Sequence, residues 1–210
     1  MKRILPWLLT LLLLASSANA EIVGRAGDDY IHQWIAPGGQ PLYFVSPEEE
    51  PYVRMEDVNF DGVEDVVVTT VRGASNLFEE FFVWDGERYV PVTHAGADRL
   101  ANYTLYPELG LVETYLQEGW AGALHTRKLW RWRGTDLECV RTAYGSEVNT
   151  MTVEDDFATV VTDKTRVRMR VWDDLNDAAL MELIVPLGDM DAMLAADREE
   201  IRVFWDGLMP

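Results

Sequence analysis

Apolar residues in this chain of 210 residues stand in short runs or alternate with polar ones, and turn-forming residues separate the runs. β-Branched and aromatic residues dominate the runs, which is the composition that strands favour. The most pronounced predicted strands cover residues 66–71, 78–84, 124–132 and 167–172. A succession of short strands divided by turns predicts an antiparallel all-β architecture.

Weaker patterns predict further strands around these. They cover residues 30–45 (two strands about a Pro-Gly-Gly turn), 52–55, 88–92, 103–106, 110–117, 137–142, 157–162 and 180–185. Asp85-Gly86 predicts a tight hairpin turn, and residues 133–136 and 173–177 predict further turns. Residues 21–29 carry no decisive pattern, and residues 94–101 fit a short helix or a loop.

Only one stretch of the chain has the pattern of a helix. In residues 189–200, Asp189 can cap the first turn, and apolar residues fall near one face. Residues 201–205 then predict a last strand.

No break in composition divides the chain into parts. We therefore predict that residues 21–210 form one small β-propeller-like domain, or a sandwich, with one short C-terminal helix. The Trp-Asp pairs at 84–85 and 172–173, each where a strand meets a turn, favour the propeller.

The first twenty residues have the features of a secretory signal peptide. Lys2 and Arg3 provide a positive start, residues 4–15 are mostly apolar, and Ala18-Asn19-Ala20 forms a small-x-small cleavage site. The apolar run is shorter than a membrane span requires. We therefore expect residues 1–20 to be removed, leaving a periplasmic chain without a membrane anchor.

The mature chain is strongly acidic. Removing Lys2 and Arg3 from the 18 basic residues leaves 16 against 36 acidic ones, a net charge of −20. Such a charge repels nucleic acids and anionic membranes and excludes both as partners, whereas it attracts cationic proteins and metal ions. Cys139 is the only cysteine, which excludes an internal disulfide. Because it lies in an alternating pattern, we expect a buried structural residue of a strand.

One acidic loop carries the most specific chemical signal of the chain. Oxygen-bearing side chains alternate along residues 57–65, a glycine follows the third of them, and a further carboxylate closes the loop. This spacing is that of a calcium loop, because calcium takes several oxygen ligands around a sharp turn. The expected ligands are the side chains of Asp57, Asn59, Asp61 and Asp65 and the backbone carbonyl of Val63. The alternative is an ordinary Asp/Asn/Gly-rich turn without a metal.

The end of the loop differs from that of an EF-hand. Counting from Asp57, position twelve is Val68, where an EF-hand has a bidentate glutamate, and the flanking residues are predicted strands. We therefore expect the β-hairpin relative of that loop. Three carboxylates this close repel one another, so a cation would stabilise their ionised forms.

The sequence lacks the recognisable catalytic motifs. His32, His94 and His125 form no HExxH pair for zinc, and the chain has no GxSxG nucleophile motif and no glycine-rich phosphate loop. Carboxylates are too abundant for one glycosidase-like pair to be singled out. The sequence therefore favours a protein that is not an enzyme, with a carboxylate-dependent envelope hydrolase as the less favoured alternative.

A candidate contact surface lies between the predicted strands at 110–117 and 124–132. Trp120 stands between two glycines, and exposed aromatic residues on turns often anchor protein–protein contacts. The predicted partner-binding residues are Gly119, Trp120, Gly122 and His125. The alternative is a tryptophan that folds back over a strand end.

The acidic loop resembles the calcium loop of the FG-GAP and VCBS repeats of integrin-like propellers. Over residues 50–145, the chain is similar to periplasmic calcium-binding immunity proteins, which inhibit lysozyme-like, peptidoglycan-cleaving effectors of bacterial secretion systems. The similarity includes the loop at 72–76, the turn at 84–86, the glycines at 119 and 122 and the strand ending at 130–132.

This resemblance implies a small β-propeller-like fold with bound calcium and a loop that enters the active-site cleft of a glycan hydrolase. In the family that loop carries a glycine followed by a tyrosine, and here Leu124-His125-Thr126 stands where the tyrosine is expected. We therefore expect an exported immunity protein that binds and inhibits a basic, lysozyme-like cell-wall hydrolase. A structural or binding module of the cell envelope is the alternative.

Overall fold

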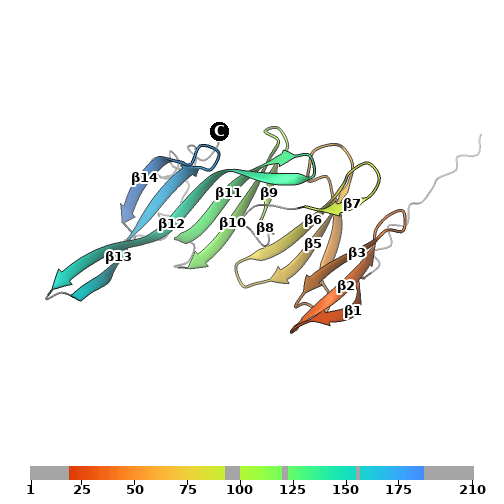
Figure 1. Ribbon diagram of the computed structural model, residues 1–210, viewed down its shortest axis with the longest axis horizontal. Helices are drawn as coiled ribbons and strands as arrows, with labels where there is room; N and C mark the ends of the chain where they lie inside the picture. The colour runs from red at the N-terminus through yellow and green to blue at the C-terminus, as the bar shows by residue number, and fades with distance from the viewer. Residues whose placement is uncertain (1–18, 93–99, 120–122, 155–156, 187–210) are drawn as a thin grey trace, which may run out of the picture.

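The computed structural model describes residues 19–92, 100–119, 123–154 and 157–186, and within these ranges the chain is all β. The strands form three antiparallel sheets that follow one another in chain order along the molecule (Figure 1). None of the described residues belongs to a helix, so none forms a helix long and apolar enough to cross a membrane. The predicted helix at 189–200, the predicted strand at 201–205 and most of the predicted signal peptide lie outside the described ranges.

The first sheet contains three strands in chain order. They are β1 (Glu21–Ala26), β2 (Asp29–Ile35) and β3 (Pro41–Ser46). β2 and β3 are the two strands predicted within 30–45, and the chain turns between them at Gly38 and Gly39, whose φ angles are +87° and +89°. The sequence did not predict β1, because this edge strand is mostly exposed and therefore has no buried face to mark it.

The second sheet is built around a buried central strand. Its strands are β4 (Tyr52–Glu56), β5 (Asp65–Arg72), β6 (Leu77–Trp84) and β7 (Tyr89–Pro91), with β8 (Leu100–Ala101) paired to the other end of β6. Residues 65–70 of β5 are all buried, which explains their nearly continuous run of β-branched residues. The predicted Asp85-Gly86 turn joins β6 to β7, and the Asp85 carboxylate accepts the backbone N–H groups of Glu87 and Arg88.

The third sheet has six strands, ordered β14-β13-β12-β11-β10-β9. They are β9 (Thr104–Tyr106), β10 (Leu111–Gly119), β11 (Leu124–Arg133), β12 (Asp136–Glu154), β13 (Phe157–Asp173) and β14 (Ala178–Pro186). The predicted turn at 173–177 joins the last two strands. Cys139 lies in β12, as predicted, and is partly buried against the core.

The strands predicted at 157–162 and 167–172 are wrong as separate elements, because both belong to β13. The polar residues between them form a bulge: Val148 pairs with Asp163 and Glu147 with Val167, so residues 164–166 have no partner in β12. The Asp163 carboxylate accepts the N–H of Thr165 at 2.9 Å and holds the bulge. β12 also continues well past its predicted end, and the two long strands project from the sheet as a ribbon (Figure 1).

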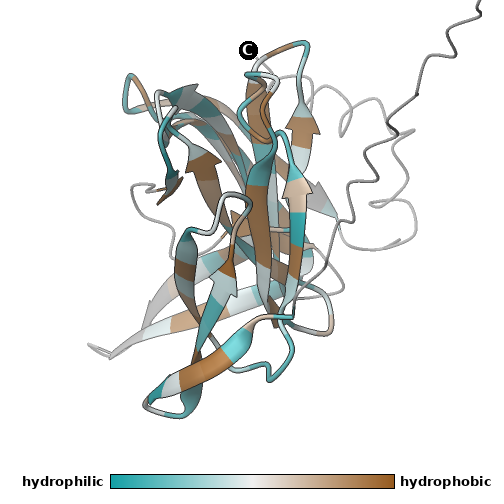
Figure 2. Cartoon of the chain, turned by 90° about the vertical axis from the view of Figure 1, so that its right-hand side faces the viewer, coloured by the Kyte–Doolittle hydropathy of each residue, from teal (hydrophilic) through white to brown (hydrophobic). Residues whose placement is uncertain are grey.

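The buried apolar residues form three clusters, two of which join consecutive sheets. One contains Trp34 and Phe44 of the first sheet together with Val66 and Phe82 of the second. Another joins residues of the second sheet to Trp130 and other residues of the third. Figure 2 shows the hydrophobic positions concentrated on the strands. The sheets are therefore held together face against face.

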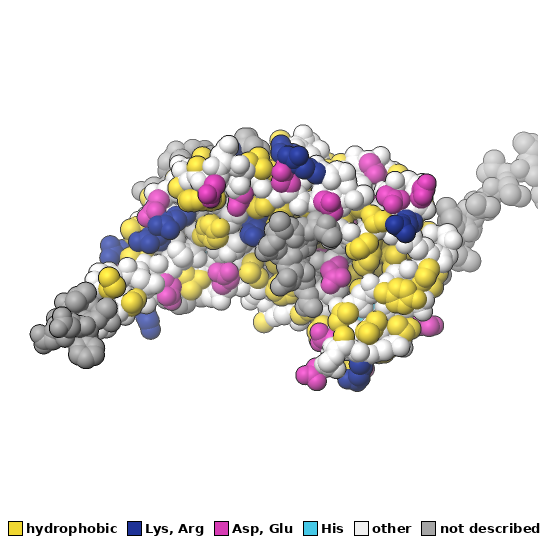
Figure 3. All heavy atoms as spheres, viewed as in Figure 1, with side chains coloured by type: hydrophobic (Ala, Val, Ile, Leu, Met, Phe, Trp, Pro, Cys, Tyr) yellow, Lys and Arg dark blue, Asp and Glu magenta, His cyan; other side chains and the backbone are white. Residues whose placement is uncertain are grey.

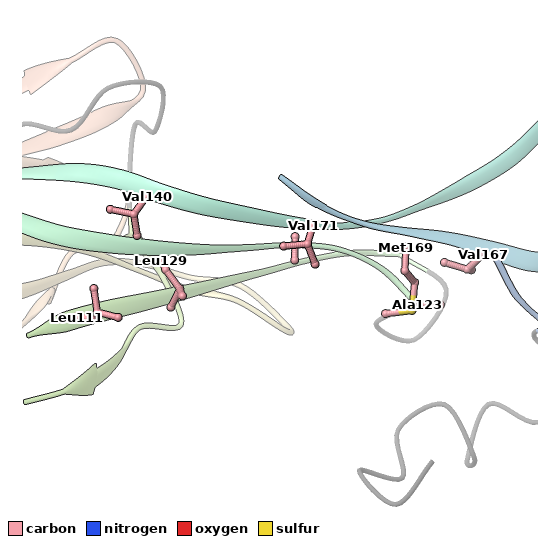
Figure 4. Close-up of a cluster of buried hydrophobic side chains, with 8 residues drawn as sticks. Leu111, Ala123, Leu129, Val140, Val167, Met169 and Val171 are labelled. Atoms are coloured by element: carbon pink, nitrogen blue, oxygen red, sulfur yellow. The ribbon is translucent and has the colours of Figure 1, made fainter. Parts of the chain in front are cut away.

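The remaining cluster lies on the third sheet itself. Figure 4 shows its side chains, which come from β10 to β13 and from Ala123. Gly145 of β12 lies beside this cluster, under the ring of the buried His125. A Cβ at Gly145 would overlap the Ala123 carbonyl oxygen and lie 2.8 Å from two atoms of the His125 ring.

Gly145→Ala is therefore expected to lower the free energy of unfolding by about 1–3 kcal/mol, because β11 must move away to admit the methyl group. Urea unfolding measures the change. Gly24→Ala is the matched control, because its Cβ would meet only the Ile31 side chain at an ordinary contact distance of 3.4 Å. Equal stability of the two variants would contradict the close packing at Gly145.

Candidate functional site

The acidic loop connects β4 to β5 in the second sheet. Both flanking elements are strands, as predicted, and Val68, at the position of the EF-hand glutamate, is fully buried in the middle of β5. Gly62 has a φ of +85°, so a glycine stands where the chain turns sharply. Phe60 also has a positive φ, +66°, and its side chain packs against the core between the second and third sheets.

The first three predicted ligands fold back onto the amides of their own loop. Asp57 accepts the N–H of Asp61 with one carboxylate oxygen at 3.2 Å and the N–H of Gly62 with the other at 2.9 Å. The Asn59 side-chain oxygen accepts the same Asp61 N–H at 3.0 Å, and Asp61 accepts the N–H of Val63 at 2.8 Å. Because Asp57 and Asn59 share one donor, their oxygens lie on the same side of the loop.

Asp65 has a different environment, because its side chain is fully buried. One carboxylate oxygen accepts the N–H of Val58 at 3.1 Å, and the other accepts the N–H of Trp84 in β6 at 2.9 Å. Burial raises the pKa of Asp65 to about 6, against the opposing effect of these hydrogen bonds, and the nearby charge of Asp61 raises it further. The carboxylate therefore closes the loop and also ties it to the neighbouring strand.

Val58 attaches the loop to the protein core. Its side chain is fully buried in the cluster between the second and third sheets. Its N–H donates to Asp65, and its carbonyl accepts the indole N–H of Trp132 in β11 at 2.8 Å. The acidic loop is therefore attached to the third sheet as well as to its own.

The residues of the loop have the donor types that calcium prefers: three carboxylates, one amide oxygen and one backbone carbonyl. Among the described residues, no group of three or more His, Cys, Asp or Glu side chains is gathered closely enough to hold a metal. The side-chain oxygens of the predicted ligands instead accept backbone N–H groups, all from the loop except that of Trp84. Val63 exposes 41% of its surface, and Glu64 is exposed beside it, so the loop faces solvent.

The predicted partner-binding loop is described only at its two ends. Gly119 ends β10, and His125 lies in β11 with 4% of its surface exposed and its ring 5.6 Å from that of Tyr115. Trp120 and Gly122 lie outside the described residues. The predicted contact therefore remains a prediction.

The remaining reactive side chains do not come together in the described part of the chain. His32 is buried in the first sheet, His125 in the third, and His94 lies outside the described ranges. Burial raises the pKa of the Cys139 thiol to about 11, which is the opposite of what a nucleophile needs. Asp173 accepts the N–H groups of Leu175 and Asn176, as in an ordinary hairpin turn.

The structure contains one polar cluster that the sequence patterns did not predict. Arg54 and Glu56 lie two residues apart in β4 and so point to the same face, which was the available signal. Their partners, Glu79 and Tyr103, come from distant parts of the chain. A local pattern cannot show such pairs.

Val58→Ala tests the anchoring of the loop. It is expected to lower the free energy of unfolding by about 2 kcal/mol, because it removes buried methyl groups and leaves a cavity. The measurement is urea unfolding in the presence of a chelator. Val63→Ala is the same substitution at an exposed position of the same loop and is expected to change stability by less than about 0.5 kcal/mol. Similar losses in both variants would contradict the anchoring.

Comparisons with known families, curated proteins and solved structures give no match for this chain. The inference of its function therefore rests on its own residues: the acidic loop, the net charge and the sequence motifs that carry the resemblance described above.

Proposed function

We propose that the chain is an exported calcium-binding β-domain that binds and inhibits a lysozyme-like, peptidoglycan-cleaving enzyme, and so acts as an immunity protein. The observation that carries the proposal is the loop at 57–65, with its alternating oxygen ligands and its glycine between two strands. The similarity to periplasmic calcium-binding immunity proteins supplies the class of partner.

The proposed calcium ligands are the side chains of Asp57, Asn59, Asp61 and Asp65 and the carbonyl of Val63. The buried carboxylate of Asp65 supports this assignment, because a nearby cation would offset the unfavourable burial of its charge. Without a glutamate at position twelve, the loop suits a fixed structural ion better than a calcium sensor.

The proposal extends to the architecture, in which the three sheets are successive blades of an open, propeller-like array. The two core clusters support this, because each lies between consecutive sheets. A two-layer sandwich would instead have one core between its two sheets.

The net charge supports a basic protein partner. With a charge of −20, the mature chain attracts cationic proteins over long range, and its association with one would weaken as salt is added. The proposed contact loop is the one containing Gly119, Trp120, Gly122 and His125.

Calcium binding predicts a rise in melting temperature when calcium is added to the chelated protein. At a free calcium concentration of 100 times Kd the gain is about 2.7 kcal/mol, or roughly 5–10 °C for a domain of this size. Differential scanning calorimetry measures it. Asp61→Ala is expected to abolish the rise, whereas Glu64→Ala, at a position that is exposed beside the ligands, should retain it. A wild-type protein that does not respond to calcium would refute the calcium site.

Inhibition predicts that the mature chain stops a basic, lysozyme-like enzyme at an equimolar ratio, with the effect weakened by salt. Clearing of a peptidoglycan suspension measures the enzyme, and the chain alone should release nothing from it. If the chain itself cleaves peptidoglycan, and one carboxylate substitution removes that activity, the hydrolase alternative is correct. Absence of both inhibition and cleavage would favour the envelope-module alternative.

A further inference from the structure

A groove of about 530 Å³ lies between β4 and β6 of the second sheet and residues 102–105, which lead into β9 of the third. We call it the polar groove, because charged side chains form much of its lining. The lining residues that matter here are Arg54, Glu56, Glu79, Tyr103, Leu77 and Leu105.

Arg54 organises the polar part of the groove. Its guanidinium contacts a Glu79 carboxylate oxygen at 2.8 Å and donates to the Tyr103 hydroxyl at 2.6 Å. The Tyr103 hydroxyl in turn donates to Glu56. Thr69 donates to the same Glu79 oxygen that Arg54 contacts, at 3.0 Å. These contacts fix the position of both carboxylates.

In each of these two carboxylates, one oxygen is hydrogen-bonded and the other is available to accept a bond. Among the described residues, Glu56 Oε1 and Glu79 Oε2 have no hydrogen-bond or ion-pair partner, while the other oxygen of each group is occupied. The Glu79 side chain is only 6% exposed, and yet it lines the groove. A carboxylate oxygen without a protein partner can accept a hydrogen bond from a ligand, and one guanidinium cannot neutralise two carboxylates.

Two leucines give the groove a smaller apolar part. Leu77 exposes 45% of its surface, and Leu105 lies in the same lining. Long cationic side chains match such a site, because their methylene stems pack on apolar surface while their charged ends reach polar groups. A bare metal ion matches it poorly, and no group of metal-ligating side chains is gathered among the described residues.

The charge around the groove has the sign that attracts such a side chain. Residues 21–101, which contain the first two sheets, hold five basic and sixteen acidic residues, a net charge of −11. Residues 104–186, which contain the third sheet, hold nine basic and fourteen acidic residues, a net charge of −5. Figure 3 shows Lys and Arg side chains gathered over the third sheet. The field of the molecule is therefore more attractive to a cation on the side of the first two sheets, where β4 and β6 line the groove.

We propose that the polar groove binds an arginine or lysine side chain of a basic partner protein, with Glu56 Oε1 and Glu79 Oε2 as its acceptors. The identity of that partner rests on the proposed function, but the capacity of the groove to bind an alkyl cation does not. The groove is distinct from the predicted contact loop at 119–125, so it would form a second point of attachment.

The probe is n-butylguanidinium, followed by NMR on the mature chain at low salt. It should cause saturable shifts at Arg54, Tyr103 and Leu77, with a Kd in the millimolar range that is expected of one weak ion pair. The neutral isostere n-butylurea should bind at least tenfold more weakly. Tetramethylammonium, which has the charge but no donor and no stem, should cause no saturable shift in the groove.

Glu56→Gln should weaken n-butylguanidinium at least threefold, and Tyr103 can still donate to the side-chain oxygen of glutamine, which protects the fold. Glu87→Gln makes the same charge change in the exposed turn between β6 and β7 and should leave the Kd unchanged. Shifts that are spread over the acidic surface, or a Kd that Glu56→Gln and Glu87→Gln change equally, would overturn the groove site.

Inhibition of a lysozyme-like enzyme separates the two proposals. If n-butylguanidinium binds in the groove but the wild-type chain inhibits no such enzyme, the groove site stands and the proposed function fails. If the wild-type chain inhibits the enzyme but the probe does not bind, the groove site fails and the proposed function stands. Both hold if Glu56→Gln, and not Glu87→Gln, also weakens inhibition.

Discussion

The burial of one carboxylate, that of Asp65, determines how the acidic loop is held. Its two oxygens accept one N–H from within the loop and one from the end of β6, so the same group closes the loop and joins it to the next strand. Burial of the charge is unfavourable, as the raised pKa of about 6 indicates. A hydrogen-bonded carboxylate at this position therefore leaves a local excess of negative charge, which a bound cation would relieve.

The acidic loop can stabilise the contact between two sheets because it is attached to both of them. Two apolar interfaces hold the three sheets in series, and no disulfide can reinforce them, because the chain has a single cysteine. The loop lies where the second interface begins, with Val58 buried in it and Trp132 bonded to the Val58 carbonyl. Fixing the loop would therefore stabilise the contact between two sheets, not only one turn.

Local sequence patterns predicted what depends on neighbouring residues. The β-branched run at 66–71, the Asp85-Gly86 turn and the glycine of the acidic loop all lie as expected, because composition and turn chemistry act over a few residues. β13 was divided in two, since a bulge and a turn both consist of polar residues. The polar groove was missed, because Arg54 and Tyr103 are 49 residues apart and meet only through sheet packing.

The negative charge is unevenly divided between the sheets. The first two sheets, residues 21–101, have a net charge of −11 and contain the acidic loop, whereas the third, residues 104–186, has a net charge of −5 and extends as a two-stranded ribbon. Solubility alone would be served by acidic residues spread evenly over the molecule. The larger charge of the first two sheets instead gives the molecule an asymmetric field, which would speed the encounter with a basic partner and favour one orientation. The acidic part is therefore the side on which such a partner would first arrive.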